Sequence, residues 1–205
     1  MLKASYKILN VFAQQPWKRF TFKEVKTLSK NKSESYVYGA LKDFASKEIL
    51  NQETAGKTIL YSAKKTQQAI TNLAWASEYF AWNQKHIPYK VLEKITAKVP
   101  TSFFTLIITG SYAQNKQKPT SDIDIAILCD DQADTQKIYA ELRHQCEMSI
   151  PEVHLYVLKE KEFYEMLTNK DPNYGKEIAN KNLILIGGEI YYNIIMEAIS
   201  HGFNG

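Results

Sequence analysis

Two aspartates, one residue apart in an apolar segment, are the residues of this chain whose types and spacing most clearly indicate chemistry. Asp122 and Asp124 alternate with isoleucines in the segment SDIDIAIL. Because side chains alternate along a strand, both carboxylates are predicted to project from one face. Carboxylates placed this way repel each other unless a cation lies between them. The pair therefore predicts a divalent metal site, and oxygen ligands on a rigid strand favour Mg²⁺.

A Gly-Ser pair follows an apolar strand and precedes the aspartates. Gly110 lets the backbone approach a phosphate closely, and Ser111 adds an amide and a hydroxyl donor. We predict that these two residues bind the phosphates of a nucleotide. Lys116 and Lys118 in the following polar loop are candidates to contact the same phosphates, and the alternative is that both are simply solvated.

A third acidic side chain would complete a site in which metal ions assist displacement at phosphorus. Glu152 opens the segment PEVHLYVL and is predicted to be the third ligand or a general base. His154 shares its strand face and is the other candidate, unless it is an ordinary half-buried histidine. Spaced acids also occur on exposed strands, but the flanking Ile123 and Ile125 indicate a buried strand, in which unexplained acids are unfavourable.

The stretch GSYAQNKQKPTSDIDIAIL resembles the signature of the DNA polymerase beta superfamily of nucleotidyltransferases, in its minimal prokaryotic branch. The resemblance extends over about residues 89–168. It implies that Gly110 and Ser111 bind a nucleoside triphosphate, with ATP the expected donor. It also implies that Asp122 and Asp124 ligate Mg²⁺. A nucleoside monophosphate would then pass to an acceptor hydroxyl, with release of pyrophosphate.

The chain departs from this family pattern at Gln114 and Asn115, where Arg-Gly is common. Asparagine tolerates positive φ better than other residues that carry a side chain, so the turn is expected to survive. The missing arginine removes one contact to phosphate. The third acid of the family is usually aspartate, whereas this chain offers Glu152.

The segment before this site has the pattern of three short helices and a hairpin. Helical spacing predicts helices over 4–14, 22–29 and 33–47, and Thr21 with Glu24 forms a capping box before the second. Two short strands, 50–53 and 58–62, surround Gly56. This order describes a winged helix-turn-helix over residues 1–64.

The same segment is strongly basic. Residues 1–65 contain 13 Lys and Arg against 5 Asp and Glu, a net charge of +8, whereas the remainder carries −4. Such a surface attracts a phosphate backbone, and a winged helix places its third helix in the major groove. The predicted DNA or RNA contacts are Lys30, Lys32, Ser35, Tyr36, Tyr38, Lys42 and Lys57. The alternatives are a protein-docking module and core positions for Tyr36 and Tyr38.

The remaining elements define the fold class. Residues 65–88 are predicted to form a linking helix, in which Trp75 and Trp82 share a face that suits an interdomain or homodimer seam. Residues 89–205 alternate helices and strands, with strands at 103–109, 122–129 and 153–158 and helices at 89–98, 134–148, 160–167 and 190–200. The prediction is an α+β protein: an N-terminal winged helix-turn-helix, then a small mixed-sheet nucleotidyltransferase domain with flanking helices.

Composition argues against several other classes. With 44% hydrophobic and 23% charged residues, the chain is typical of globular proteins. Its apolar runs are far shorter than the roughly 20 residues of a membrane span, and no export signal is recognisable. Cys129 and Cys146 are too far apart in sequence to suggest a zinc motif or a disulfide framework. A cytoplasmic protein is expected.

These observations predict a Mg²⁺-dependent nucleotidyltransferase that modifies a hydroxyl on a protein, a nucleic acid or a small molecule. The alternative is a DNA-binding transcription regulator, or an antitoxin-like protein, whose transferase-like domain senses a nucleotide. Some minimal nucleotidyltransferases adenylylate a tyrosine of a partner toxin, and this resemblance motivates the protein acceptor.

Overall fold

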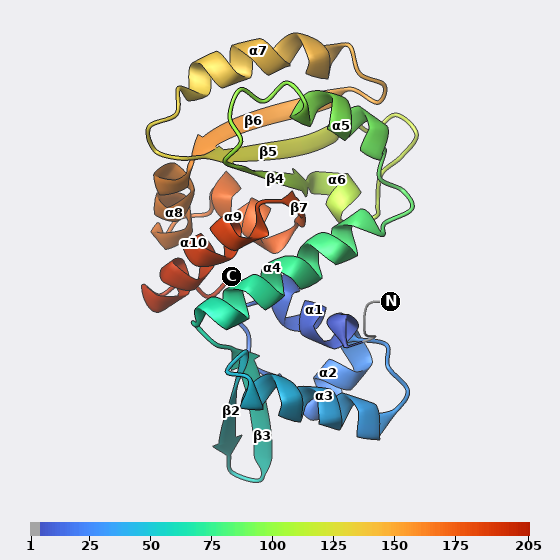
Figure 1. Cartoon of the computed structure of the whole chain (residues 1–205), viewed down its shortest axis with the longest axis vertical. Coiled ribbons are helices and arrows are strands. Elements are labelled where there is room, and N and C mark those ends of the chain that lie inside the picture. The colour runs from blue at the N-terminus through green and yellow to red at the C-terminus, as the bar shows by residue number, and fades with distance from the viewer. Residues whose placement is uncertain (1–4) are drawn as a thin grey trace.

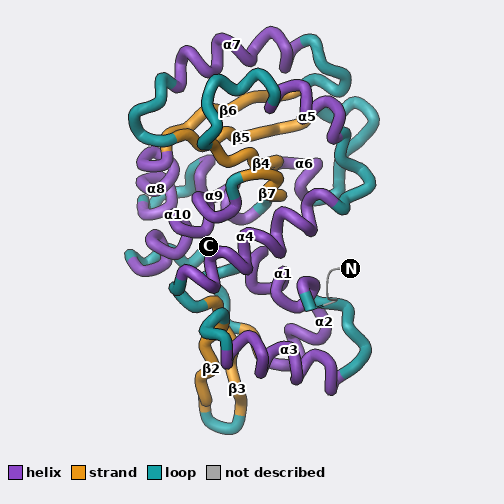
Figure 2. The backbone as a smooth tube through the Cα atoms, viewed as in Figure 1, coloured by secondary structure: helices purple, strands orange, loops and turns teal. Residues whose placement is uncertain are grey.

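The computed structural model describes residues 5–205, which form ten helices and seven strands in two separate sheets (Figures 1 and 2). Residues 1–4, with which the predicted 1–64 module begins, lie outside the described residues, and so does Ala4 of the predicted first helix. The mixed α+β class is confirmed.

The N-terminal elements surround a small three-stranded sheet. In chain order they are α1 (Tyr6–Gln14), β1 (Phe20–Thr21), α2 (Phe22–Leu28), α3 (Glu34–Ser46), β2 (Leu50–Ala55) and β3 (Thr58–Ala63). The strands are antiparallel, in the order β1-β3-β2. The predicted capping box is confirmed, because the Glu24 carboxylate accepts the Thr21 backbone N–H at 2.8 Å and the Thr21 hydroxyl accepts the Glu24 N–H at 3.3 Å.

The second sheet has four strands in the order β6-β5-β4-β7. They are β4 (Phe104–Thr109), β5 (Ile123–Cys129), β6 (Val153–Lys159) and β7 (Leu183–Ile186). Only the pair of β5 and β6 is parallel, since α7 (Thr135–Glu147) connects them. The other helices of this region are α5 (Tyr89–Thr96), α6 (Gly110–Ala113), α8 (Glu160–Thr168), α9 (Tyr174–Asn180) and α10 (Gly188–Ser200).

Alternation along β5 explains how this sheet is covered on both faces (Figure 1). Ile123, Ile125 and Ile127 pack in one core with residues of α5 and α7. Ala126 and Leu128 pack in the other core with residues of α8, α9 and α10. Asp124 has the same parity as Ala126 and therefore projects on the second face.

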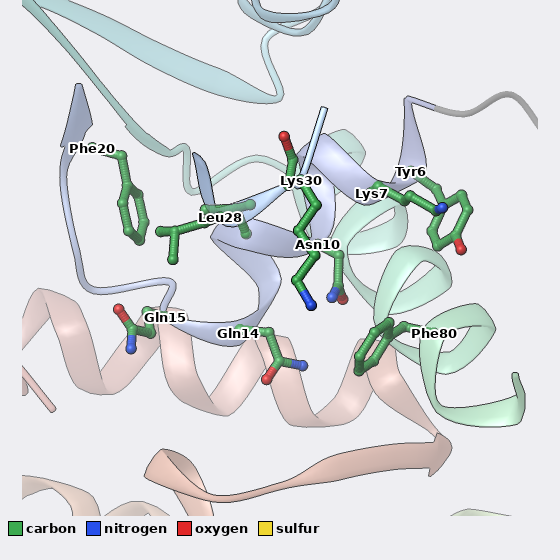
Figure 3. Close-up of a pocket in the computed structure, with 11 residues that line it drawn as sticks. Tyr6, Lys7, Asn10, Gln14, Gln15, Phe20, Leu28, Lys30 and Phe80 are labelled. Atoms are coloured by element: carbon green, nitrogen blue, oxygen red, sulfur yellow. The ribbon is translucent and has the colours of Figure 1, made fainter. Parts of the chain in front are cut away.

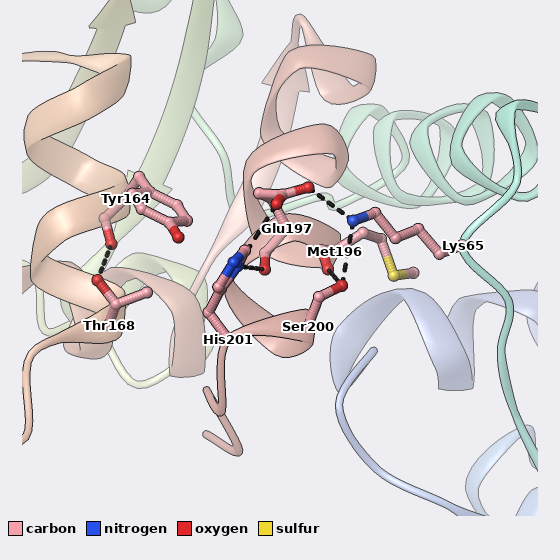
Figure 4. A network of polar contacts seen from close by, with 7 residues as sticks. All are labelled: Lys65, Tyr164, Thr168, Met196, Glu197, Ser200 and His201. Atoms are coloured by element: carbon pink, nitrogen blue, oxygen red, sulfur yellow. Dashed lines mark hydrogen bonds and ion pairs between the residues drawn. The ribbon is translucent and has the colours of Figure 1, made fainter.

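Helix α4 (Gln67–Trp82) joins the two halves of the molecule. It packs against α1, α10 and β7, and one buried core extends continuously from Ile8 to Phe203. The buried Tyr192 hydroxyl donates to the Ala13 carbonyl at 2.9 Å. Before the helix begins, Lys65 pairs with Glu197 at 2.6 Å, near the end of α10 (Figure 4).

The two tryptophans of α4 have different surroundings. The Trp82 indole N–H donates to the Leu185 carbonyl at 2.8 Å, so this ring lies on the seam between α4 and β7. Trp75 stacks on Tyr79 with ring centroids 5.8 Å apart and is 40% exposed. A homodimer through this face stays a prediction.

Four short elements were not anticipated from the sequence: β1, α6, α9 and β7. Gly187 has φ of 73°, and α10 begins directly after it, two residues before the predicted start at residue 190. Cys129 and Cys146 are both buried and free, and burial raises the pKa of each thiol to about 11. Across residues 5–205, none of the helices combines the length and apolarity that a membrane crossing requires.

A partly buried carboxylate of α4 that contacts the start of α10 gives the first testable prediction. Glu78 of α4 accepts the Gly188 N–H at 2.7 Å, and burial raises the pKa of this carboxyl group. The pKa of Glu78 is therefore higher in the folded protein than in the unfolded chain. Its protonated form contributes stability at low pH, and this contribution is lost as the pH rises above about 4.3, the ordinary value for Glu. Glu78→Gln keeps the acceptor without the charge. We expect it to gain stability relative to wild type between pH 4 and pH 7.

Urea unfolding at several pH values measures this effect, and Glu141→Gln, on the exposed side of α7, is the matched control. If the difference in unfolding free energy between Glu78→Gln and wild type does not change with pH, the raised pKa of Glu78 is contradicted.

Candidate functional site

Antiparallel pairing of β4 and β5 brings the Gly-Ser pair next to the two aspartates. Thr109 ends β4 and pairs with Asp124 of β5. Gly110 and Ser111 follow directly and open α6, a single helical turn where the sequence suggested a plain bend. The Thr109 hydroxyl donates to the Lys181 carbonyl at 2.9 Å, which anchors the end of the strand.

Gly110 is required at this position for two independent reasons. Its φ of 65° lies in the left-handed region that side chains disfavour. A Cβ atom built on Gly110 would also collide with Oδ2 of Asp124. The bend and the carboxylate therefore touch, as the sequence-based prediction required.

The two aspartates point to a common neighbour, His154 of β6. Asp122 precedes β5 by one residue, and its Oδ2 lies 3.5 Å from His154 Nε2. Asp124 Oδ1 lies 3.5 Å from His154 Nδ1. The side chains of Asp122 and Asp124 are 43% and 31% exposed, so both can be reached by a ligand from solvent.

Charges around Asp124 make this carboxylate unfavourable without a counter-charge. Burial is the largest cause that raises the pKa of Asp124, and the nearby charges of Asp122 and Glu177 raise it further. His154 acts in the opposite direction. A cation bound to the carboxylates would relieve both the burial penalty and the repulsion.

The parallel register of β5 and β6 decides which β6 residue contacts the aspartates. Asp124 is paired with His154, and Ile123 with Val153. Glu152, the predicted third ligand, precedes β6, and its backbone carbonyl accepts the Ile123 N–H at 2.9 Å. Its exposed side chain has the same parity as His154, and within residues 5–205 no hydrogen bond or ion pair involves it. The structure thus brings His154 to the aspartates, and the role of Glu152 stays a prediction.

The loop after α6 is closed by its own hydrogen bonds. Asn115 adopts φ of 54°, the left-handed conformation expected of an asparagine in place of glycine. The Lys118 N–H donates to the Ser121 hydroxyl at 2.9 Å, and the Lys116 ammonium donates to the Gln114 side chain at 3.2 Å. Both lysines are exposed, and among the described contacts neither ammonium group reaches the aspartates.

Helix α9 contributes residues that sequence reasoning missed. Tyr174 packs against Tyr156 with ring centroids 4.4 Å apart, and the buried Tyr174 hydroxyl lacks a hydrogen-bond partner within the described residues. Burial, then Tyr156 and Asp124, raise the pKa of Tyr174. Asn173 caps the helix by accepting the Lys176 N–H at 3.1 Å, and this capping signal is readable from the sequence. The proximity of α9 to β5 is not, because it depends on tertiary packing.

The donor set suits Mg²⁺ held jointly with a substrate. Asp122 and Asp124 offer carboxylate oxygens on one side of the sheet, and Mg²⁺ is usually bound by one or two carboxylates plus phosphate and water. In the part of the chain that the structure describes, no group of three or more His, Cys, Asp or Glu side chains is arranged as a metal site.

The predicted nucleic-acid contacts lie on the N-terminal half and are all exposed. They are Lys30, Lys32, Ser35, Tyr36, Tyr38, Lys42 and Lys57. Tyr36 and Tyr38 are 39% and 57% exposed, so neither belongs to the core. The ion pairs recorded for residues 5–205 use other lysines, which leaves the four lysines of this set available to an anionic partner.

Comparison with known proteins agrees with this geometry. No curated protein and no solved structure matches the chain. Residues 93–187, which contain the Gly110 bend and both aspartates, match the family model described as polymerase beta, nucleotidyltransferase. The match supports a nucleotidyltransferase domain of the DNA polymerase beta superfamily in this part of the chain.

Proposed function

We propose that this protein transfers a nucleoside monophosphate from a nucleoside triphosphate, with ATP the expected donor, to an acceptor hydroxyl in a Mg²⁺-dependent reaction. The acceptor oxygen forms a bond to the α-phosphorus, the bond to the bridging oxygen breaks, and pyrophosphate leaves. The observation that carries the proposal is the contact between Asp124 and the Gly110 bend, with Asp122 on the same side.

The residues have separate roles in this proposal. Gly110 and Ser111 bind the triphosphate through backbone N–H groups and a hydroxyl, and Lys116 and Lys118 add positive charge from the loop. Asp122 and Asp124 hold Mg²⁺, which, when bound, neutralises phosphate charge and polarises the reacting oxygens. Glu152 completes the ligand set or accepts the proton of the acceptor hydroxyl.

Incubation of the protein with each of the four α-³²P-labelled nucleoside triphosphates tests the activity directly. Mg²⁺-dependent release of pyrophosphate, or label on a supplied acceptor, is the expected result. Candidate acceptors are the protein itself, a neighbouring gene product and RNA. If no triphosphate binds in a Mg²⁺-dependent manner and Asp122→Ala changes nothing, the enzymatic function is excluded.

The role of Glu152 can be separated from that of His154 by Mg²⁺ titration. Glu152→Gln is expected to raise the Mg²⁺ concentration for half-maximal rate about tenfold, because a supporting carboxylate typically changes metal affinity by that factor or more. His154→Asn is the comparison variant. If Glu152→Gln leaves the half-maximal Mg²⁺ concentration unchanged and His154→Asn shifts it, His154 rather than Glu152 supports the metal.

A second function, nucleic-acid binding by the N-terminal half, is favoured by one observation. The order of three helices and a hairpin places an exposed α3 beside a hairpin that carries Lys57 at its turn. We propose that this winged helix-turn-helix binds DNA or RNA, with α3 in the groove and the hairpin on the backbone. The +8 charge of the first 65 residues supports the proposal.

Salt dependence tests this second function. Each phosphate that a lysine neutralises contributes about −0.9 to the slope of log K against log salt for B-DNA. The triple variant Lys32→Ala, Lys42→Ala, Lys57→Ala is therefore expected to reduce the slope by about 3, measured by fluorescence anisotropy. The control replaces the exposed lysines 90, 94 and 137 of α5 and α7. If the two triple variants show equal slopes of log K against log salt, these lysines do not contact phosphates. The protein-docking alternative for the N-terminal module is then favoured.

A further inference from the structure

A cavity of about 470 Å³ lies in the N-terminal half, and neither Asp122 nor Asp124 is among its lining residues. Figure 3 shows the residues that line it. One side of α1 forms its wall, with Tyr6, Asn10 and Gln14 on successive turns. The end of α2 contributes Leu28 and Lys30, and Phe80 of α4 closes another side. Its volume falls within the range of small-molecule sites, about 300–1,000 Å³.

Asn10 is the feature of this cavity that packing does not explain. It is 8% exposed and lies between the buried apolar residues Leu9 and Val11. Its Oδ1 is buried and has no hydrogen-bond partner within the described residues. An unsatisfied buried amide is unfavourable, and a leucine would fit the apolar pattern of α1 better. Asn10 lines the cavity, and rotation of its amide group would turn Oδ1 toward a molecule bound there.

Lys30 places positive charge at the same cavity, from the left-handed position that ends α2. It follows α2 with φ of 52°, where glycine is the preferred residue after a helix. Figure 3 shows its side chain extending toward Asn10. Within residues 5–205, no ion pair involves Lys30 or Lys7, and no acidic residue lines the cavity. The two lysines supply uncompensated positive charge at an otherwise largely apolar site.

We propose that this cavity binds a small, planar organic anion. The amide of Asn10 hydrogen-bonds the polar edge of the planar body, and Lys7 and Lys30 neutralise the anionic group. Phe80, Phe20 and Leu28 contact the apolar surface. Aromatic carboxylates and nucleoside monophosphates share this chemistry. Neither Asp122 nor Asp124 lines the cavity, so the site is separate from the proposed transferase site. Lys30 also belongs to the predicted nucleic-acid contacts, and its place in this cavity leaves Lys32, Lys42 and Lys57 to carry that role.

Binding to the full-length protein tests the proposal, with indole-3-carboxylate and AMP as probes, measured by calorimetry in EDTA. We expect one probe to bind with one-to-one stoichiometry. The variants Asn10→Leu and Lys30→Gly should each weaken that binding about tenfold, as the loss of one hydrogen bond or one charge contact implies. The probe that binds identifies the anionic group.

Both variants are designed to remain folded. Asn10→Leu removes an unsatisfied amide, and Lys30→Gly relieves a left-handed backbone, so the melting temperature of each unliganded variant should equal or exceed that of wild type. Glu48→Gly, which changes another left-handed residue (φ of 59°) outside the cavity, is the matched control and should bind like wild type. Failure of both probes at millimolar concentration overturns the proposal. So does binding that is lost in Asp124→Asn but retained in the two cavity variants.

Discussion

Asp124→Asn is expected to lower the rate of nucleotidyl transfer about 10³-fold while the protein remains folded. The variant keeps the shape of the side chain but removes the charge that holds Mg²⁺. A bound metal ion stabilises the transition state by several kcal/mol. Each 1.36 kcal/mol of this stabilisation that is lost lowers the rate tenfold. Because burial raises the pKa of Asp124, its charged form is disfavoured in the metal-free fold. The melting temperature of the variant at neutral pH should therefore equal or exceed that of wild type.

Initial rates with labelled ATP and a differential scanning measurement on the same samples test this result. Asp130→Asn, just beyond the other end of β5, is the control and should retain wild-type rates. If Asp124→Asn retains full activity, the aspartates do not hold the metal. If it merely unfolds, Asp122→Asn, whose side chain is more exposed, provides the same comparison.

Gly110→Ala is expected to combine a loss of stability with a loss of activity. The left-handed backbone at this position disfavours alanine by about 1–2 kcal/mol. In addition, the new methyl group would displace the Asp124 carboxylate, with which it collides. A displacement of about 1 Å in a catalytic group lowers rates about 10²-fold. Urea unfolding measures the first effect and the transfer assay measures the second.

Gly56→Ala separates these two effects. Gly56 has φ of 61°, close to that of Gly110, but a Cβ atom there meets nothing within 4 Å. This control should show the backbone strain alone, with an unchanged transfer rate. Equal rates for both alanine variants would mean that the contact between the bend and Asp124 has no catalytic importance.

Local patterns in the sequence were sufficient to predict much of the site. The two-residue period of a strand predicted that Asp122 and Asp124 share a face, and both lie within 3.5 Å of one histidine. The tolerance of asparagine for positive φ predicted that the turn survives at Asn115, which has φ of 54°. The φ of 65° at Gly110 was not predicted, although it agrees with the conformational freedom of glycine. These features depend on neighbours in sequence, where the physical rules are strongest.

Features that depend on contacts between distant segments were not predictable in the same way. Glu152 and His154 have the same parity, and the strand register, which places His154 opposite Asp124, distinguishes them. Tyr174 and Glu177 reach the surroundings of Asp124 only because α9 packs against the sheet. A one-residue change of register would exchange the faces of β6, and no sequence period reports register between strands separated by a helix.

The central position of α4 determines how the two halves of this protein can be studied. Shortened versions that begin after residue 64 would strip α1 from α4 and break up the core that the two halves share. Such fragments are prone to aggregate, and a failure of theirs to bind nucleic acid or nucleotide would be uninformative. Surface substitutions in the intact chain are the sounder way to silence one half while the other is assayed.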